Sequence, residues 1–314
     1  MLRTAAALAL ASGLAATSTP ASTPTRTVPR GVAISGVAVG GLSAEPARAR
    51  IQAAFARSIR VTYQGKNIWI SPASLGAGLS VDAAVTSALA ATPQSHIALP
   101  VRYSRARLDR AVAALARRFD RAAVDATVVG ATASGPEFTQ PRAGLAVDVK
   151  TMRTALAQVL RDGTREPLTL LTHPVAPRQT VAGFGPVVVI TRGANVLRLY
   201  DGPRLVRTFR VATGQAIYPT PGGLWRIMDK QRDPWWYPPT TSAWAKGLKP
   251  VPPGPANPLG TRWMGLDAAG VGIHGTTAPA SIGYSASHGC IRMQVPEAEW
   301  LFERVHVGTP VVIL

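Results

Sequence analysis

The order of hydrophobic and polar positions divides the chain into two stretches with different periodicity. Up to about residue 178, segments with helical apolar spacing alternate with short strand-like pairs. From residue 185 onward, short apolar or alternating runs separated by turn residues predict successive strands. The expected helices cover residues 47–57, 83–91, 107–120 and 149–160, and the expected strands lie within 58–70, 124–139, 187–191, 196–200 and 206–213. The pattern therefore predicts an α+β first part and a mainly β second part.

The first stretch contains an internal repeat. GLSVD at residues 78–82 recurs as GLAVD at 144–148, and an Ala/Leu-rich helical segment follows each copy. The aspartates of the two copies, Asp82 and Asp148, stand where the N-cap of each helix is expected. Each copy reads helix, strand, strand, helix, and neither holds a set of acid, base and nucleophile. We therefore expect the repeated unit to serve as a scaffold or a binding module.

The second stretch contains one long irregular segment. Residues 234–258 hold eight prolines together with Trp235, Trp236, Tyr237 and Trp244, which is too punctuated for regular structure. Such an aromatic loop is either a lid beside an active site or a surface loop pinned by its own tryptophans. The one helix predicted in this half covers residues 296–305.

The N-terminus has the composition of an export signal. Residues 1–16 carry one early positive charge, at Arg3, followed by an uncharged Ala/Leu-rich run that is too short to span a bilayer. Residues 17–29 are rich in Ser, Thr and Pro and are typical of a flexible stalk. We therefore expect an exported protein, on the extracytoplasmic side of the membrane, with the signal either cleaved or kept as a tether. The expected division is 1–30 signal or tether and stalk, 31–178 duplicated module, and 185–314 mainly β domain.

The charge of the chain is strongly basic and uneven. The 314 residues carry a net charge of +18, and residues 1–184 hold 21 basic and 9 acidic side chains against 13 and 7 in residues 185–314. A basic surplus attracts polyanions, and for an exported protein an anionic cell-wall polymer or lipid is a better candidate than nucleic acid, which we do not expect as a partner. The alternative is arginine accumulated on a solvated surface through biased composition.

The strongest chemical signal is the single cysteine, Cys290. It stands in SHGCIRM at residues 287–293, and His274 opens an HGT motif sixteen residues earlier. Thiolate is the reactive form of cysteine and imidazole is the usual group that generates it, so this arrangement predicts a nucleophile. The alternatives are a small buried core residue and, less favoured, a metal ligand, since no second cysteine or carboxylate stands at ligand spacing. No nucleotide motif is present, and we expect neither a metal nor a cofactor.

Together these motifs resemble the signature of the L,D-transpeptidases with a YkuD-type catalytic domain. Residues 187–214 resemble the opening hairpin of that domain, TPGG at 220–223 its turn, and NPLGTRWM at 257–264 the strand before the histidine. The resemblance covers residues 185–314 and implies a mainly β fold, a β-sandwich with a short C-terminal helix. Residues 31–178 resemble a YoaR-like peptidoglycan-binding module, whose signature is shorter.

The resemblance implies a cysteine-dependent acyltransferase that takes part in peptidoglycan synthesis, cell wall organisation and cell shape. Such an enzyme forms a thioester with a tetrapeptide stem, releases D-Ala and passes the acyl group to an amine of a neighbouring stem. Water as acceptor would make it an L,D-carboxypeptidase, and carbapenem-type β-lactams are the expected inhibitors. A non-catalytic wall-binding protein is a third possibility that the intact histidine and cysteine motifs oppose. A sortase would carry its arginine on a separate later strand, whereas Arg292 follows Cys290 almost directly.

The resemblance also implies a role for each residue of the motifs. Cys290 would be the nucleophile, and His274 the general base held by a neighbouring backbone carbonyl in place of an acid, with His288 supporting. The backbone N–H groups of Gly289 and Cys290, and of His288, would form the oxyanion hole. Arg292 would hold a substrate carboxylate or fix the loop. The remaining supporting residues are Gly275, Ser287, Trp263 and Met264.

Overall fold

The computed structural model describes residues 26–163 and 165–314. They form two compact units, one made of residues up to 118 together with 147–171, and one made of 119–146 together with 172–314. The export signal and most of the stalk expected in residues 1–30 lie outside the described residues. Within the described part, no helix is long and apolar enough to cross a bilayer.

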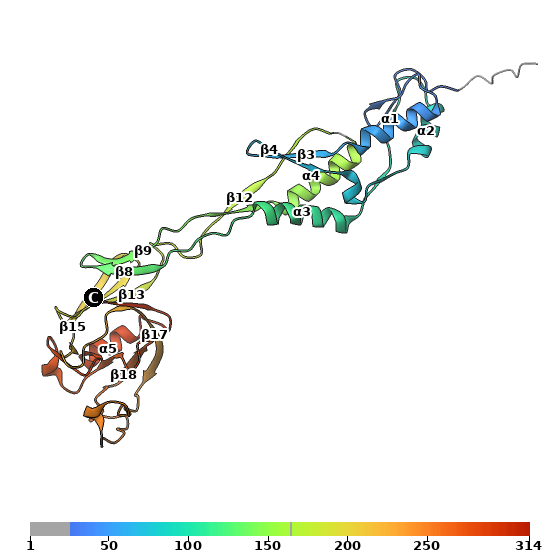
Figure 1. Ribbon diagram of the computed structural model, residues 1–314. Coiled ribbons are helices and arrows are strands. Elements are labelled where there is room, and N and C mark those ends of the chain that lie inside the picture. The colour runs from blue at the N-terminus through green and yellow to red at the C-terminus, as the bar shows by residue number, and fades with distance from the viewer. Residues whose placement is uncertain (1–25, 164) are drawn as a thin grey trace, which may run out of the picture. The chain divides into compact units, whose positions relative to one another are not determined.

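The first unit is an α+β arrangement of four helices and small sheets (Figure 1). Its helices are α1 Ala44–Ala56, α2 Val81–Leu89, α3 Arg105–Phe119 and α4 Val149–Asp162. Its strands are β1 Ala33–Ile34, β2 Val37–Ala38, β3 Ile59–Tyr63, β4 Lys66–Ile70, β5 Gly78–Leu79, β6 His96–Ile97, β7 Val101–Arg102 and β11 Leu168–Thr169. They pair in the orders β2-β1-β6, β11-β3-β4 and β5-β7.

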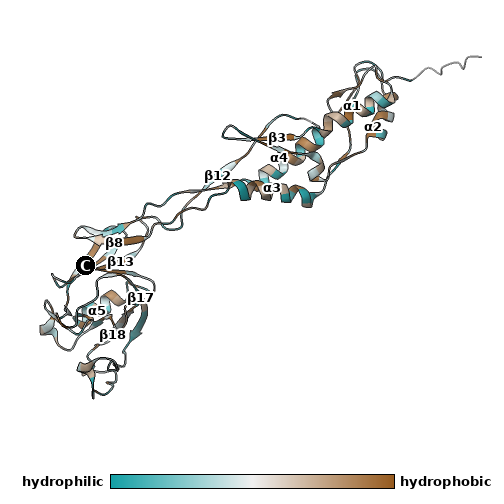
Figure 2. Ribbon diagram, in the orientation of Figure 1, coloured by the Kyte–Doolittle hydropathy of each residue, from teal (hydrophilic) through white to brown (hydrophobic). Residues whose placement is uncertain are grey.

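The helices form where apolar residues repeat at helical spacing. On α3, Leu108, Val112 and Leu115 are buried, and on α4, Met152 and Leu156 are fully buried. Figure 2 shows hydrophilic and hydrophobic residues interleaved along these helices, as expected for elements with one face in a core. Both copies have the predicted helices and strand pair, and in each a third short strand, β5 or β10 Gly144–Val147, precedes the second helix.

The two expected N-caps differ. Asp148 caps α4 by accepting a hydrogen bond from the backbone N–H of Thr151 at 2.9 Å. Asp82 is not a cap, because α2 begins two residues earlier than the repeat predicts and Ser80 takes the N-cap position. Asp82 lies in the first turn, where its carboxylate pairs with Arg48 at 2.7 Å.

The second unit is mainly β and is built on an eight-stranded sheet of order β15-β14-β13-β22-β17-β18-β19-β21. The sheet strands are β13 Pro186–Thr191, β14 Val196–Asp201, β15 Arg204–Arg210, β17 Gly223–Arg232, β18 Arg262–Leu266, β19 Gly272–Gly275, β21 Ile291–Met293 and β22 Pro310–Ile313. The other elements are β8 Val128–Thr132, β9 Gly135–Phe138, β10 Gly144–Val147, β12 Thr172–Val175, β16 Thr213–Gly214, β20 Ser285–Ser287 and α5 Val295–Phe302. This unit has the mainly β character and short helix near the C-terminus that the sequence predicts.

One face of the sheet closes around the main hydrophobic core. The C-terminal strand β22 lies between β13 and β17, parallel to the first and antiparallel to the second. The apolar residues of these strands, such as Ile190 and Ile227, pack with Leu301 and Phe302 of α5. Helix α5 packs against β18 and β19, and Figure 1 shows it beside β18. This core holds the strands that position the candidate active site.

The opposite face of β13 and β22 is covered by the β8–β9 hairpin. Val128 packs with Val187, Val189, Tyr200 and Val312 in a second apolar cluster. The hairpin comes from the part of the chain predicted as the N-terminal module, yet it belongs to the second compact unit. The functional boundaries 31–178 and 185–314 stay a prediction.

Candidate active site

The strands β18, β19 and β21 separate core residues from cavity residues by simple alternation. Ile273 and Ile291, which face each other in the register, are fully buried in the main core. His274 and Arg292, the next pair in that register, point to the other face. His274 thus lies on β19, and Cys290, sixteen residues later in the chain, directly precedes the adjacent parallel strand β21.

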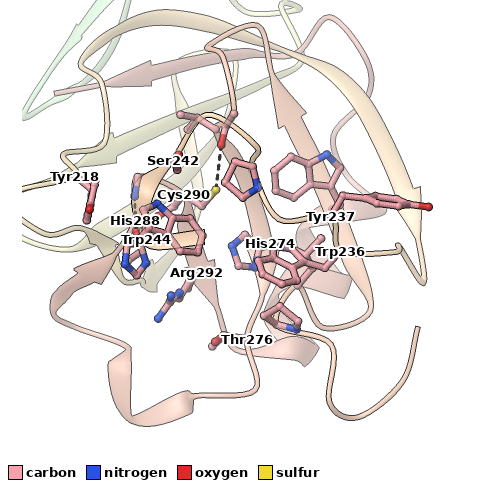
Figure 3. A pocket seen from close by; sticks show the side chains of 18 of the residues that line it. Tyr218, Trp236, Tyr237, Ser242, Trp244, His274, Thr276, His288, Cys290 and Arg292 are labelled. Atoms are coloured by element: carbon pink, nitrogen blue, oxygen red, sulfur yellow. Dashed lines mark hydrogen bonds between the residues drawn. The ribbon is translucent and has the colours of Figure 1, made fainter. Parts of the chain in front are cut away.

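That face lines a cavity of about 1040 Å³ (Figure 3). Cys290, His274, His288 and Arg292 all line it. None of the described residues that line the cavity is acidic. Asp267, the acid nearest to His274 in the sequence, instead accepts a hydrogen bond from the backbone N–H of Arg226 at 2.8 Å. The cavity therefore carries basic groups only and favours an anionic ligand.

The thiol of Cys290 is the candidate nucleophile. Its Sγ donates to the carbonyl oxygen of Gly270 at 3.5 Å, and it stays partly accessible from the cavity. Burial raises the pKa of the Cys290 thiol, and the hydrogen bond to the Gly272 backbone and the charge of Arg292 offset only part of this effect. The resting thiol is therefore protonated near neutral pH, and a base must remove its proton before it can attack.

His274 has the properties of such a base. It is 4% exposed, and its Nδ1 lies 2.5 Å from the carbonyl oxygen of Gly275. Because a carbonyl only accepts hydrogen bonds, Nδ1 carries the proton and Nε2 holds a free lone pair. Burial lowers the pKa of His274 to about 4, more than the Gly275 contact raises it. The imidazole is therefore neutral and able to accept a proton over the physiological pH range.

The SHGC turn is held by its own serine. Ser287 Oγ accepts from the backbone N–H of Gly289 at 3.1 Å and donates to the carbonyl oxygen of Cys290 at 2.5 Å. Gly289 has a φ of +111°, a conformation that a side chain would strain. Thr220, fully enclosed, donates from Oγ1 to the Gly289 carbonyl at 2.8 Å. Thr220 has no separate signal in the sequence, where it appears only as part of the TPGG turn.

These bonds change the expected oxyanion hole. The N–H of Gly289 was predicted to be a donor to substrate, but it already serves Ser287 Oγ. The N–H groups of Cys290 and His288 have no acceptor among the described residues. They are therefore the donors of this turn that an oxyanion could use.

His288 lies between two aromatic rings. Trp244 stacks on it at 4.1 Å between ring centroids and 23° between planes, and Tyr218 lies 5.0 Å away on a tilted ring (Figure 3). Desolvation, with the charge of Arg292 second, lowers the pKa of His288. Unlike His274, it has no hydrogen bond that fixes its tautomer among the contacts of the described residues. His288 thus contacts the aromatic loop through Trp244, in a position from which it can support the candidate site.

The other supporting residues separate into two groups. Trp263 lines the cavity 5.9 Å from the His274 ring, and a Cβ on Gly272 would overlap its indole. Met264, in contrast, is fully buried on the core face, so it packs the strand and does not reach the cavity. Gly275 contributes its carbonyl oxygen to His274. Trp263 and Gly275 together restrict the imidazole.

The aromatic loop of residues 234–258 forms one wall of the cavity. Trp235, Trp236, Tyr237 and Trp244 all line it. Asn257 fixes the base of this loop, because its fully buried Nδ2 donates to the carbonyl of Pro234 at 2.7 Å and to that of Pro252 at 3.1 Å. The loop thus lies beside the candidate site, which is the position that the interpretation as a lid requires.

Among the described residues, no group of three or more His, Cys, Asp or Glu side chains is arranged to hold a metal ion. The chemistry that the cavity offers is that of a thiol, a neutral imidazole, backbone N–H groups and a guanidinium. These groups suit acyl transfer to and from a thiol.

Comparison with known proteins identifies the family of the catalytic domain. Residues 185–313 match the model of the L,D-transpeptidase catalytic domain, and residues 68–168 match that of the "Putative peptidoglycan binding domain". A "Putative L,D-transpeptidase YqjB" of Bacillus subtilis is 35% identical over 41% of this chain and 70% of its own length. A "Putative L,D-transpeptidase YkuD" of Bacillus licheniformis is 33% identical over 40% of this chain and 64% of its own length. A crystal structure of Enterococcus faecium L,D-transpeptidase is 17% identical, with a TM-score of 0.38, and covers 84% of this chain and 98% of that one.

The match with the Bacillus subtilis relative extends over more than two thirds of that relative. The family model matches residues 185–313, a range that includes His274 and Cys290. The chain therefore belongs to the L,D-transpeptidases with a YkuD-type catalytic domain, joined here to a peptidoglycan-binding module.

Proposed function

We propose that this chain is a cysteine L,D-transpeptidase that exchanges amide bonds between peptidoglycan stems. The observation that carries the proposal is one cavity holding a lone thiol and a buried imidazole whose Nε2 is kept free by the Nδ1–Gly275 contact. The two groups are neutral at rest, so the pair works as nucleophile and general base. No acid is needed to hold the imidazole, since the carbonyl performs that task.

In the first half-reaction, the Cys290 thiol gives its proton to Nε2 of His274 while Sγ attacks the carbonyl carbon between the third stem residue and D-Ala. The N–H groups of Cys290 and His288 stabilise the oxyanion that forms. The amide C–N bond then breaks, the imidazolium gives its proton to the departing amine, and D-Ala leaves. The acyl group stays on Cys290 as a thioester.

In the second half-reaction, an amine of a neighbouring stem gives a proton to His274 and attacks the thioester carbonyl. The C–S bond breaks and the proton returns to the sulfur. Because one amide is lost and one is formed, the exchange needs no external energy source, which suits a compartment without ATP. Water in place of the amine would give L,D-carboxypeptidase activity.

Arg292 is the proposed contact for the donor carboxylate. Its guanidinium lines the cavity, and no carboxylate of the described residues pairs with it. The carboxylate of a terminal D-Ala lies about 3 to 4 Å from the carbonyl carbon that is attacked. An arginine two residues after the nucleophile is therefore within reach of that carboxylate, and a bidentate pair would fix the stem end.

The proposed setting is the cell wall. The peptidoglycan-binding module supports a wall-bound role, and the basic surplus of residues 1–184 supports attraction to anionic wall polymers. An enzyme of this kind acts where its substrate is, so we propose export to the extracytoplasmic face.

The experiment is to incubate the full chain with a disaccharide-tetrapeptide and identify the products by mass spectrometry. Transfer predicts free D-Ala and a cross-linked dimer, whereas hydrolysis predicts free D-Ala and a tripeptide. Cys290→Ala should give neither product. Release of D-Ala by Cys290→Ala would contradict the proposed mechanism.

A further inference from the structure

Two exposed aromatic rings stand side by side on the wall of the active-site cavity. Trp235 is 50% exposed and Tyr237 is 67% exposed, and both line the cavity that holds Cys290. Their ring centroids lie 6.2 Å apart with 23° between the planes, so the two faces form a nearly parallel pair. In Figure 3 the Tyr237 ring points away from Cys290, toward the outside of the cavity.

The backbone holds this pair in place. Trp236, between them, exchanges two hydrogen bonds with Val251, each of 2.9 Å, and the carbonyl of Pro234 is bound by Asn257. In an extended segment residues two apart point to the same side, which places the first and third rings together. The pair is therefore fixed before any ligand arrives, which lowers the entropy cost of binding.

The exposed faces of Trp235 and Tyr237 are available to a ligand. Aromatic rings contribute most when their faces are covered, and contiguous exposed apolar surface beside a cleft marks a site of interaction. The core does not use these two rings, since neither belongs to an apolar cluster of the described residues. None of the described residues that line the cavity is acidic, so this wall offers ring faces and hydrogen-bonding groups without a carboxylate.

We propose that Trp235 and Tyr237 form a platform for a pyranose ring of the glycan strand, so that the enzyme binds the sugar as well as the peptide of its substrate. The apolar C–H face of a pyranose ring is flat, uncharged and of the size of an aromatic ring, which is the shape this pair can cover. The inference rests on the proposed function, because that function places a stem peptide on Cys290 and the stem is joined to a sugar.

The dimensions agree. Three extended stem residues, from the attacked carbonyl back to the sugar, span about 10 Å. The same cavity of about 1040 Å³ holds Cys290 and is lined by Trp235 and Tyr237, so a stem bound at Cys290 has its sugar end within that cavity or at its margin. The exposed pair lies on that margin.

The test compares two donors, a disaccharide-tetrapeptide and the same tetrapeptide without sugar, by the KM for D-Ala release. In the parent chain we expect the KM to be about threefold to tenfold lower for the donor with sugar. Trp235→Ala and Tyr237→Ala should each bring the two KM values closer together, and the double variant should make them nearly equal. Trp235→Phe and Tyr237→Phe keep a ring face and should keep most of the difference.

Tyr284→Ala is the matched control, because Tyr284 is 66% exposed in the same unit and does not line the cavity. It should preserve the KM difference. Equal KM values in the parent chain, or a difference that persists in the double variant, would overturn the proposal and leave the loop as a wall for peptide only.

A binding measurement separates this proposal from the proposed function. Titration of the full chain with the free disaccharide, followed by tryptophan fluorescence, needs no turnover. We expect a saturable change that Trp235→Ala abolishes and Tyr284→Ala retains. If neither donor releases D-Ala, the proposed function fails, and the titration alone then decides the platform, since no fluorescence change would overturn it.

Discussion

At the scale of single residues, the most unusual group is the imidazole of His274. Because burial lowers its pKa to about 4, the ring stays neutral far below the range in which an exposed histidine takes up a proton. The general-base role that we propose for it should persist over the same range. The pH below which the proposed reaction slows should therefore be set by the burial of the His274 ring.

A pH profile checks this. The rate of Cys290 acylation should fall only as the pH drops through about 4, because only then does the base become protonated. Trp263→Ala opens the cavity beside the ring, so the pKa of His274 should rise toward 6.5 and the acid limb should move up with it. A parent profile with its acid limb near pH 6.5 would contradict the burial of this ring.

The two histidines of the motifs should behave differently. His274→Ala should lower the acylation rate by about a hundredfold to ten-thousandfold, because no group then takes the thiol proton. His288→Ala should keep measurable acylation, since only a stacked ring is lost and the backbone donors remain. The rates are measured with a chromogenic β-lactam after circular dichroism has shown both variants folded. Near-parent acylation by His274→Ala together with an inert His288→Ala would reverse the assignment.

Carbapenem-type β-lactams should acylate the protein once, at Cys290. The reaction needs a nucleophile and an oxyanion hole, and the chain has a single thiol. Intact-mass spectrometry should therefore show one adduct on the parent and none on Cys290→Ala. An adduct that survives in this variant would place the reactive group elsewhere.

At the scale of elements, the β8–β9 hairpin acts as a cover for the sheet. Val128 is 6% exposed against β13 and β22, whereas the next residue, Val129, is 56% exposed. The catalytic sheet therefore buries one of its faces with a segment that precedes it in the chain by about fifty residues.

Val128→Asp should destabilise the second unit by roughly 3 kcal/mol or more, because it buries a charge in an apolar cluster. Val129→Asp, one residue further along the same strand, should be nearly neutral. Urea unfolding followed by tryptophan fluorescence reports on this unit, which holds six of the seven tryptophans. Equal midpoints for the two variants would show that the hairpin does not cover the sheet.

Local periodicity explains which elements could be predicted. The helices and hairpins come from neighbours in sequence, so the spacing of Leu108, Val112 and Leu115 was sufficient to predict α3. The prediction that Asp82 caps α2 was wrong, because the helix begins two residues earlier than the repeat predicts and Ser80 occupies the N-cap position. The place of β22 in the sheet joins residues more than a hundred positions apart, and no local pattern encodes such a pairing.

The candidate site divides in the same way. Cys290, His274 and His288 stand in recognisable motifs, so the sequence could single them out as candidates, and the three line one cavity. Thr220 and Asn257 could not be identified, because each acts through hydrogen bonds to backbone carbonyls that only the fold brings near. The occupied N–H of Gly289 likewise depends on a side chain orientation, that of Ser287.

At the scale of the whole molecule, the basic surplus is the property most relevant to the wall. The net charge of +18 should make binding to intact walls depend on ionic strength, because salt screens attraction between exposed charges. With full-length Cys290→Ala, sedimentation with wall material should fall several-fold between low and high salt.

The same measurement with walls stripped of their anionic polymers provides the control. Residual binding there should be weaker and nearly independent of salt, since it would come from the glycan and stems alone. Salt-independent binding to intact walls would mean that the arginines are only a solvated surface.

The alternation along β18, β19 and β21 has a consequence for how such a protein can diverge. Every second residue faces the core and holds the sheet together, while the residues between them face the cavity. Substitutions at the cavity positions can therefore change the accepted stem or acceptor without loosening the packing beneath them. A fold arranged in this way lets descendants acquire new substrates while their stability is inherited almost unchanged.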